Sequence, residues 1–169
     1  MAKINIGIAA IALGAVGVDG GAGTTLAPLG YTTEGTAKLN WDDATETEFV
    51  VEEIDNPIYI SAKEGKKTFT FTVANPDEDT LVSAFGGVKT GTGNAATFAF
   101  PSSSVSMEKT IKITPKEGMG LLIPRAKITA KLTSDLGRAS LMGIEITGTV
   151  LEPTKVGVSA LSTFVVAKN

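Results

Sequence analysis

The stretch KKTFTFTV, Lys66–Val73, decides the fold. Its apolar and hydroxyl side chains alternate without a break: Phe69, Phe71 and Val73 against Thr68, Thr70 and Thr72. Successive side chains of an extended backbone point to opposite faces, so this alternation is typical of a strand with one face in a core and the other in water. The stretch therefore predicts a half-buried β-strand.

Alternation of the same period continues on both sides of this strand. The other predicted strands are Ala37–Asp43, Thr45–Glu53, Thr97–Phe100, Val105–Ile113, Lys127–Thr133, Ile144–Val150 and Val156–Val166. Many short strands with little helical pattern are typical of antiparallel sheets. The chain is therefore predicted to be mainly β, with two packed antiparallel sheets that form a sandwich or a partly closed barrel.

One segment, Asn75–Phe85, has a helical pattern instead. Asn75 is a suitable N-cap, Pro76 suits the first helical position, and the acidic run Asp77–Asp79 complements the positive end of the helix dipole. An apolar stripe and two terminating glycines follow: Leu81, Val82, Phe85, Gly86 and Gly87. We predict one short α-helix here. The acidic run lacks the ligand spacing of a calcium loop, so no metal is expected.

The 169 residues suit one domain, which we divide into an N-terminal arm with a flexible connection, residues 1–25, and a β body, residues 26–169. The arm carries five large apolar residues that we expect to dock on a neighbouring subunit instead of in their own core: Ile4, Ile6, Ile8, Ile11 and Leu13. A secretory signal peptide is the alternative for this run. Asn5 and three glycines within the run argue against that alternative.

The composition excludes several classes of function. The chain has no cysteine and no histidine, which removes disulfides, thiolate nucleophiles and Ser-His-Asp catalysis. Its net charge of −3 gives no general attraction for phosphate backbones. We therefore expect a protein that is not an enzyme, with no catalytic residue, no cofactor and no metal.

The glycine-rich segment Gly86–Ala95 is the first motif that invites a binding function. It lacks the spacing of a phosphate-binding loop, and it follows a helix where such a loop would precede one. We predict a mobile loop.

The acidic segment Asp42–Glu53 is the second such motif. Paired carboxylates act in glycoside hydrolysis, but the chain has one tryptophan and 6% aromatic residues, few for binding sugars. A solvated sheet face, or a negative surface toward a partner or a channel, are the remaining interpretations.

A resemblance covers Leu29–Gly87. This part combines the opening LGYTTEG, the acidic strand ETEFVVEE, the alternating strand TFTFTV, the predicted helix and two glycines. In that order it resembles the major tail tube proteins of long-tailed bacteriophages. The resemblance implies two packed antiparallel sheets with a flanking helix, as in the tube proteins of contractile tails and type VI secretion.

The resemblance also implies an assembly. Six copies would form a ring, and stacked rings would form a hollow virion tail tube through which DNA passes. The implied partners are further copies of the chain and the tape measure, tail terminator and baseplate proteins, with assembly in the host cytoplasm and no role for a membrane. No catalytic residues carry over from the family.

Two surfaces follow from combining this implication with the alternation. An acidic channel wall would repel DNA phosphates, and the residues expected to face the lumen are Lys38, Asn40, Asp42, Glu46, Glu48 and Glu52. The residues expected to contact the adjacent ring are Gly86, Gly87, Lys89, Gly91, Gly93 and Asn94.

Two other classes of function stay open at this point. A secreted or cell-surface β-sandwich adhesin or pilus subunit would share the Gly- and Thr-rich strands, and removal of the N-terminal run on export would favour it. A carboxylate-dependent hydrolase would require two acidic groups that converge in a pocket.

Overall fold

The structure, a computed structural model, describes residues 4, 6–103, 105–133 and 141–167 of the chain. The chain is mainly β with one short α-helix, as the sequence pattern predicted. In chain order the elements are β1 (Ile6–Ala15), β2 (Ala27–Pro28), β3 (Tyr31–Thr32), β4 (Lys38–Trp41), β5 (Thr45–Val51), β6 (Ile54–Lys63), β7 (Lys67–Ala74), α1 (Glu78–Phe85), β8 (Val88–Thr90), the 3-10 turn Gly93–Ala95, β9 (Thr97–Ala99), β10 (Met107–Thr133), β11 (Gly143–Val150) and β12 (Ser162–Val166).

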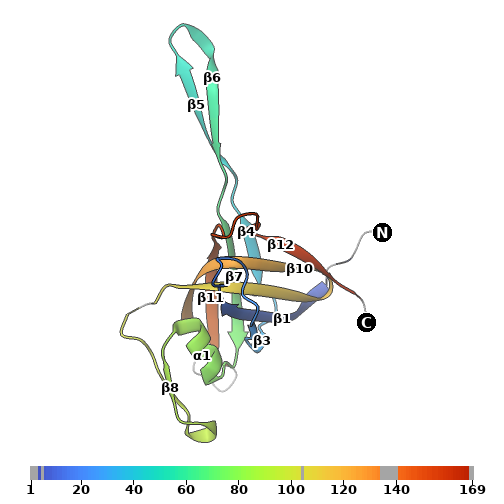
Figure 1. Cartoon of the computed structure of the whole chain (residues 1–169), viewed down its shortest axis with the longest axis vertical. Coiled ribbons are helices and arrows are strands. Elements are labelled where there is room, and N and C mark those ends of the chain that lie inside the picture. The colour runs from blue at the N-terminus through green and yellow to red at the C-terminus, as the bar shows by residue number, and fades with distance from the viewer. Residues whose placement is uncertain (1–3, 5, 104, 134–140, 168–169) are drawn as a thin grey trace.

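Eight strands form one antiparallel sheet that makes the body (Figure 1). The strand order is β2-β1-β10-β11-β7-β3, with β12 also paired to β10 and β4 also paired to β7. The sheet curls, because β1 and β3 contact each other although they lie near opposite ends of this order. It is not a closed barrel, and an opening remains between β1 and β3.

The central strand β10 folds back on itself. The Arg125 guanidinium contacts the Glu108 carboxylate at 2.8 Å, and the Thr110 hydroxyl donates a hydrogen bond to the Pro124 carbonyl at 2.7 Å. At about 3.3 Å per residue, a straight strand would separate Glu108 and Arg125 by more than about 50 Å. The chain therefore reverses between them, near Gly118, whose φ of 103° favours glycine. The first half pairs with β1 and the second with β12 and β11.

The core lies inside the curl of this sheet. Its buried residues come from β1, β7, β10, β11 and α1, with Leu29 beside them: Ile11, Leu13, Leu29, Phe69, Phe71, Val73, Leu81, Ala84, Ile111, Ile123, Ala126, Ile128, Ile144 and Ile146. The alternation of Lys66–Val73 is confirmed, because β7 buries its two phenylalanines and its valine. Each such side chain contributes about 1.5–3 kcal/mol of hydrophobic free energy.

The N-terminal run is a strand of this body, which corrects the predicted arm. β1 pairs with β10 along its length, and Ile11 and Leu13 are only 1% and 3% exposed. Ile8 packs partly against the core, whereas Ile4 and Ile6 are exposed. The expectation that the run has no place in its own core is therefore wrong for Ile11 and Leu13, because the curled sheet needs a strand beside β10.

Residues 18–25, predicted as a flexible connection, form a turn with specific contacts. The Lys155 ammonium contacts the Asp19 carboxylate at 2.6 Å. The Gly23 amide donates a hydrogen bond to the Thr110 hydroxyl at 2.8 Å. These contacts fix the turn against the body.

The helix α1 forms where the sequence predicted it, but its cap differs. Asp77 is the N-cap, and its carboxylate accepts a hydrogen bond from the Thr80 amide at 2.8 Å. Asn75, the predicted cap, has a φ of 47° and donates its amide to the Met142 carbonyl. This β-sheet contact holds Asn75 outside the helix, so the cap moves two residues along the chain. Gly86 ends the helix.

Candidate assembly surfaces

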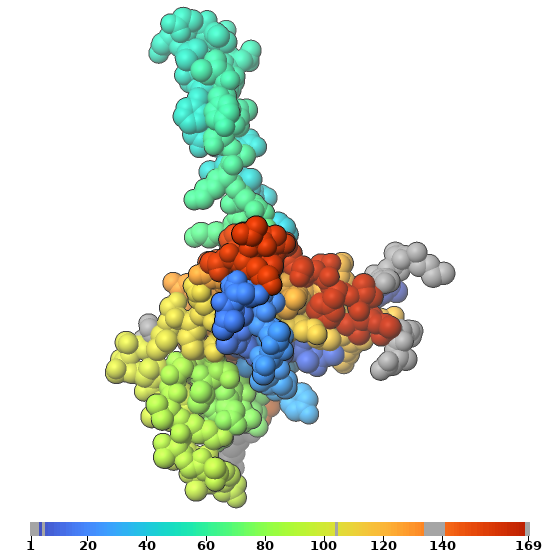
Figure 2. All heavy atoms as spheres, viewed as in Figure 1, coloured from blue at the N-terminus to red at the C-terminus, as the bar shows by residue number. Residues whose placement is uncertain are grey.

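Two β-hairpins extend from opposite ends of the body (Figures 1 and 2). The longer pairs β5 with β6, and the shorter pairs β8 with β9. Neither pairs with the eight-stranded sheet. In Figure 2 the β5–β6 hairpin stands clear of the body as a narrow projection.

The β5–β6 hairpin exposes large apolar side chains on both faces. Those that are between 37% and 64% exposed are Phe49, Val50, Val51, Ile54, Ile58, Tyr59 and Ile60. The centroids of the Phe49 and Tyr59 rings lie 5.9 Å apart, so these two rings contact each other across the strands of the hairpin. The prediction of a half-buried strand at Thr45–Glu53 is wrong, because every residue of β5 is exposed. An isolated two-stranded hairpin is only marginally stable in water, so we expect another protein surface to cover the apolar side chains of this hairpin.

The predicted lumen residues of the hairpin share its surface with apolar side chains. Glu46 lies opposite Ala62, and Glu48 lies opposite Ile60. Residues directly opposite in an antiparallel pair point to the same face, so this face is acidic along one strand and apolar along the other. Glu52 lies beyond the end of β5, in the turn at the tip. All three carboxylates are exposed.

The other predicted lumen residues lie on the body. Lys38 and Asn40 are exposed on β4, which pairs with β7. Asp42 follows directly, and its carboxylate accepts a hydrogen bond from the Asn40 amide group at 3.3 Å. The six residues are therefore divided between a body strand and the projecting hairpin. The sequence alternation could not reveal this division, because it ends at the connection between the two strands.

The glycine-rich segment contains strand β8 of a hairpin, where the sequence predicted a loop. Its attachment is an aromatic cluster in which Phe85, Phe98 and Phe100 contact one another, with centroids 4.8–6.5 Å apart. These aromatic residues, absent from the sequence-based site, carry the hairpin. The sequence pattern contained them as apolar positions: Phe85 ends the predicted helix, and Phe98 and Phe100 lie in the predicted strand Thr97–Phe100.

Half of the predicted inter-ring residues make contacts within their own subunit. Gly86 caps α1, and Gly87 lies beneath the Phe98 ring. The Lys89 ammonium contacts the Asp79 carboxylate at 2.9 Å, and this hydrogen bond raises the pKa of Lys89 above its usual value. Gly91, Gly93 and Asn94 remain, at the exposed tip of the hairpin.

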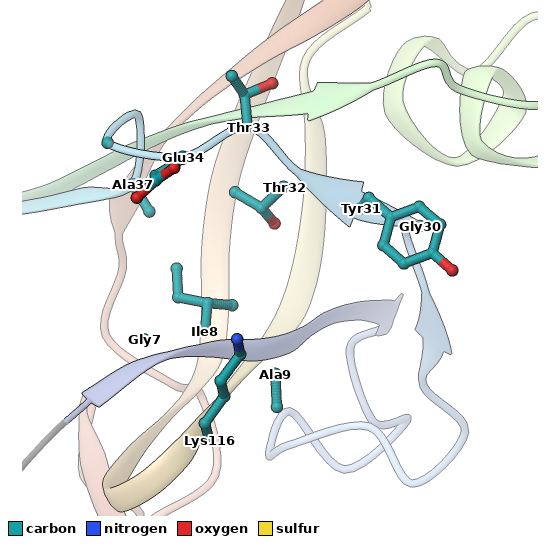
Figure 3. A pocket seen from close by; sticks show the side chains of 11 residues that line it. Gly7, Ile8, Ala9, Gly30, Tyr31, Thr32, Thr33, Glu34, Ala37 and Lys116 are labelled. Atoms are coloured by element: carbon teal, nitrogen blue, oxygen red, sulfur yellow. The ribbon is translucent and has the colours of Figure 1, made fainter.

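A cavity of about 650 Å³ opens between β1 and the segment around β3 (Figure 3). Its lining residues are Gly7, Ile8, Ala9, Gly30, Tyr31, Thr32, Thr33, Glu34, Gly35, Ala37 and Lys116. Within this lining Glu34 is the single carboxylate among the described residues. A pair of converging carboxylates, which a hydrolase would require, is not present there.

The described residues provide neither a metal cluster nor a membrane-spanning helix. Across residues 4, 6–103, 105–133 and 141–167, acidic side chains nowhere gather in a group of three that could hold a metal ion. Among these residues, no helix has the length and apolarity needed to cross a membrane.

A family model described as phage tail tube protein matches residues 15–167. The chain belongs to the phage tail tube protein family. No curated protein matches it. As a tail tube protein it has a structural role in a virion tail, where it assembles with other tail proteins.

The tail tube family gives the exposed hairpins a context. An element that exposes apolar side chains on both faces is suited to burial against another protein of the tail. The place of Ile11 and Leu13 in the core opposes the adhesin alternative in which the N-terminal run is removed, because removal would open the core of the tail tube protein.

Proposed function

We propose that this tail tube protein self-assembles into rings, six copies in each, which stack into a hollow tube for the passage of DNA. The observation that carries the proposal is the pair of hairpins that project from opposite ends of one body. Stacking requires an interface that is different on the two sides of a subunit, and a rotation that closes gives a ring. The chain would assemble in the host cytoplasm and meet the tape measure, tail terminator and baseplate proteins at the tube.

We assign the channel wall to β4 and the acidic residues that follow it. Lys38, Asn40 and Asp42 are exposed on the body, and Glu46, Glu48 and Glu52 extend this surface along the hairpin. A net negative wall would repel DNA phosphates, so DNA would slide without binding. A tube reconstruction with these side chains on the outer wall would remove this assignment.

Electron microscopy of a hairpin variant tests the proposed assembly. Val51→Asp with Ile54→Asp places charge on two apolar residues at the tip of β5–β6, where they are 37% and 51% exposed. Since neither packs in the body, the variant should fold and keep its Tm. It should form no rings or tubes in negative stain, because the apolar contact between copies is lost.

Val156→Asp is the matched control, because Val156 is 97% exposed outside the hairpins. This control should form rings and tubes like the unchanged protein. Normal tubes from the double aspartate variant would show that the hairpin tip is not required for assembly. An unchanged protein that stays monomeric at high concentration would end the proposal itself.

A further inference from the structure

The opening of the curled sheet leaves two strand edges without a partner. Within the described part of the chain, β1 pairs with β2 only at Ala12 and Leu13, so the edge formed by residues 6–10 has a strand on one side alone. In the same residues, β3 pairs only with β7. The 650 Å³ cavity lies between these edges, and we call this opening the seam. Unpaired strand edges offer backbone donors and acceptors to another chain.

The floor of the seam is apolar. A second hollow of about 140 Å³ adjoins the cavity, and both are lined by Ile8 and Ala37. The other residues around this hollow are mostly large and apolar, three of them in the core: Ile11, Leu39, Phe69, Phe71 and Ile113, with Lys38 and Thr70. The hollow is therefore suited to an aliphatic side chain.

The rim of the seam carries one cation and one anion. The Lys116 stem lies against Gly7, where an added Cβ atom would be 3.3 Å from the Lys116 Cδ. Figure 3 shows Lys116, Ile8 and Thr32 around the same opening. The ion pairs of the described residues do not include Lys116. Glu34 lies among the lining residues from the β3 side. The β1 side of the rim can therefore accept a carboxylate.

We propose that the seam of one subunit receives the tip of the β5–β6 hairpin of a second copy. The tip has the matching chemistry, since Val51 pairs with Ile54 and the turn between them is Glu52-Glu53. The two aliphatic side chains would fill the apolar hollow, and the Glu53 carboxylate would meet the Lys116 ammonium, which leaves Glu52 for the channel wall. Glu34 would keep the Glu53 carboxylate on the Lys116 side, because like charges repel.

The shape of the hairpin supports a second copy as the source of the tip. β5 has seven residues, which at about 3.3 Å per residue extend the hairpin by roughly 20 Å. In Figure 1 this length points away from its own body and its own β3. The proposal rests on the proposed self-assembly and adds the site that accepts the hairpin.

Disulfide trapping tests the contact, because the chain has no native cysteine. Glu53→Cys, in a variant that carries a size tag, marks the tip, and Thr32→Cys marks the seam. The two variants are assembled together under reducing conditions and then oxidised. A tagged–untagged heterodimer on a non-reducing gel can form only between two copies. Asn94→Cys, at the tip of the other hairpin, is the matched control partner for Thr32→Cys.

The expected result is a heterodimer from Glu53→Cys with Thr32→Cys and none from Asn94→Cys with Thr32→Cys. Tubes that form without the first heterodimer, or with the second in its place, would overturn the seam proposal and leave the proposed tube function standing. If the unchanged protein forms no tubes at all, the tube function fails, and the seam proposal fails with it.

A charge exchange gives a second measurement. Lys116→Glu should sharply lower the yield of tubes in negative stain, and adding Glu53→Lys to the same chain should restore it. Lys127→Glu makes the same charge change on an exposed lysine of β10 outside the seam, and Glu53→Lys should not restore any loss it causes. A normal tube yield from Lys116→Glu, or a loss that Glu53→Lys does not restore, would overturn the contact between Lys116 and the tip.

Discussion

The Phe69 ring on β7 lies directly over Gly148 on β11. The two residues are opposite each other in the sheet register, and a Cβ atom built at Gly148 would overlap the ring. Phe69 is only 2% exposed, and it belongs to the core. The glycine therefore provides the space that the core aromatic ring occupies beside the neighbouring strand.

Gly148→Ala should destabilise the subunit for this reason. The added methyl group must displace a buried ring, and overpacking of this kind typically costs about 1–3 kcal/mol. In a Phe69→Leu background the smaller side chain frees space, so the same change should cost less. A double-mutant cycle by urea unfolding measures the difference. If Gly148→Ala lowered the free energy of unfolding equally in both backgrounds, the Phe69 ring would not be the reason that position 148 requires glycine.

The two alternating stretches Thr45–Val51 and Lys67–Ala74 show which parts of the fold could be predicted from the sequence. Both alternate, and both form strands with their neighbours. Alternation specifies the two faces of a strand, but the covering layer comes from residues far away in the chain. β7 has the core against its apolar face, whereas β5 has none in the subunit. The fold class was therefore predictable, and the projecting hairpin was not.

The N-cap of α1 gives a prediction with a defined pH dependence. The hydrogen bonds from Thr80 lower the pKa of Asp77 below its usual 3.8. A carboxyl whose pKa is lower in the folded state stabilises the fold above its unfolded pKa, and this contribution is lost as the pH falls through the folded pKa. Asp77→Ala should cost about 1 kcal/mol at neutral pH.

Asp77→Asn separates the charge from the cap. Asparagine still accepts the hydrogen bond from the Thr80 amide, so the helix should keep its cap at every pH. Urea unfolding of both proteins should show that any stability advantage of the native aspartate shrinks below about pH 4. A difference between the two proteins that stays constant from pH 7 to pH 3 would contradict the role assigned to this carboxylate.

The two ends of β1 should respond differently to truncation of their side chains. Leu13→Ala removes a side chain that is 3% exposed, and large-to-small changes in a core cost about 2–5 kcal/mol. Ile6→Ala changes a residue that is 53% exposed and should cost much less. Denaturant midpoints of the two variants check this order. Similar midpoints would support an N-terminal arm outside the core.

The fold-back of β10 also could not be predicted from the sequence pattern, for a physical reason. Residues 114–126 contain Pro115 and Pro124, and proline lacks the amide that a strand ladder uses. The predicted strands Val105–Ile113 and Lys127–Thr133 end on either side of this segment. In the structure both prolines lie within β10, and the Pro124 carbonyl accepts a hydrogen bond from the Thr110 hydroxyl. The fold-back therefore depends on contacts between residues far apart in the chain, which a local pattern does not contain.

The tip of the β8–β9 hairpin gives the sharpest test of contact between rings. The aromatic cluster of Phe85, Phe98 and Phe100 holds the base of the hairpin, so the tip can be shortened without loss of its attachment. Replacement of residues 91–96, which connect Thr90 to Thr97, by a two-residue Asn-Gly turn should leave the Tm unchanged, because no residue of this tip is buried. Single rings should still form, while stacking should fail, since the proposed contact with the next ring is removed. Negative-stain images distinguish the outcomes: isolated rings support the contact, and tubes of unchanged length refute it.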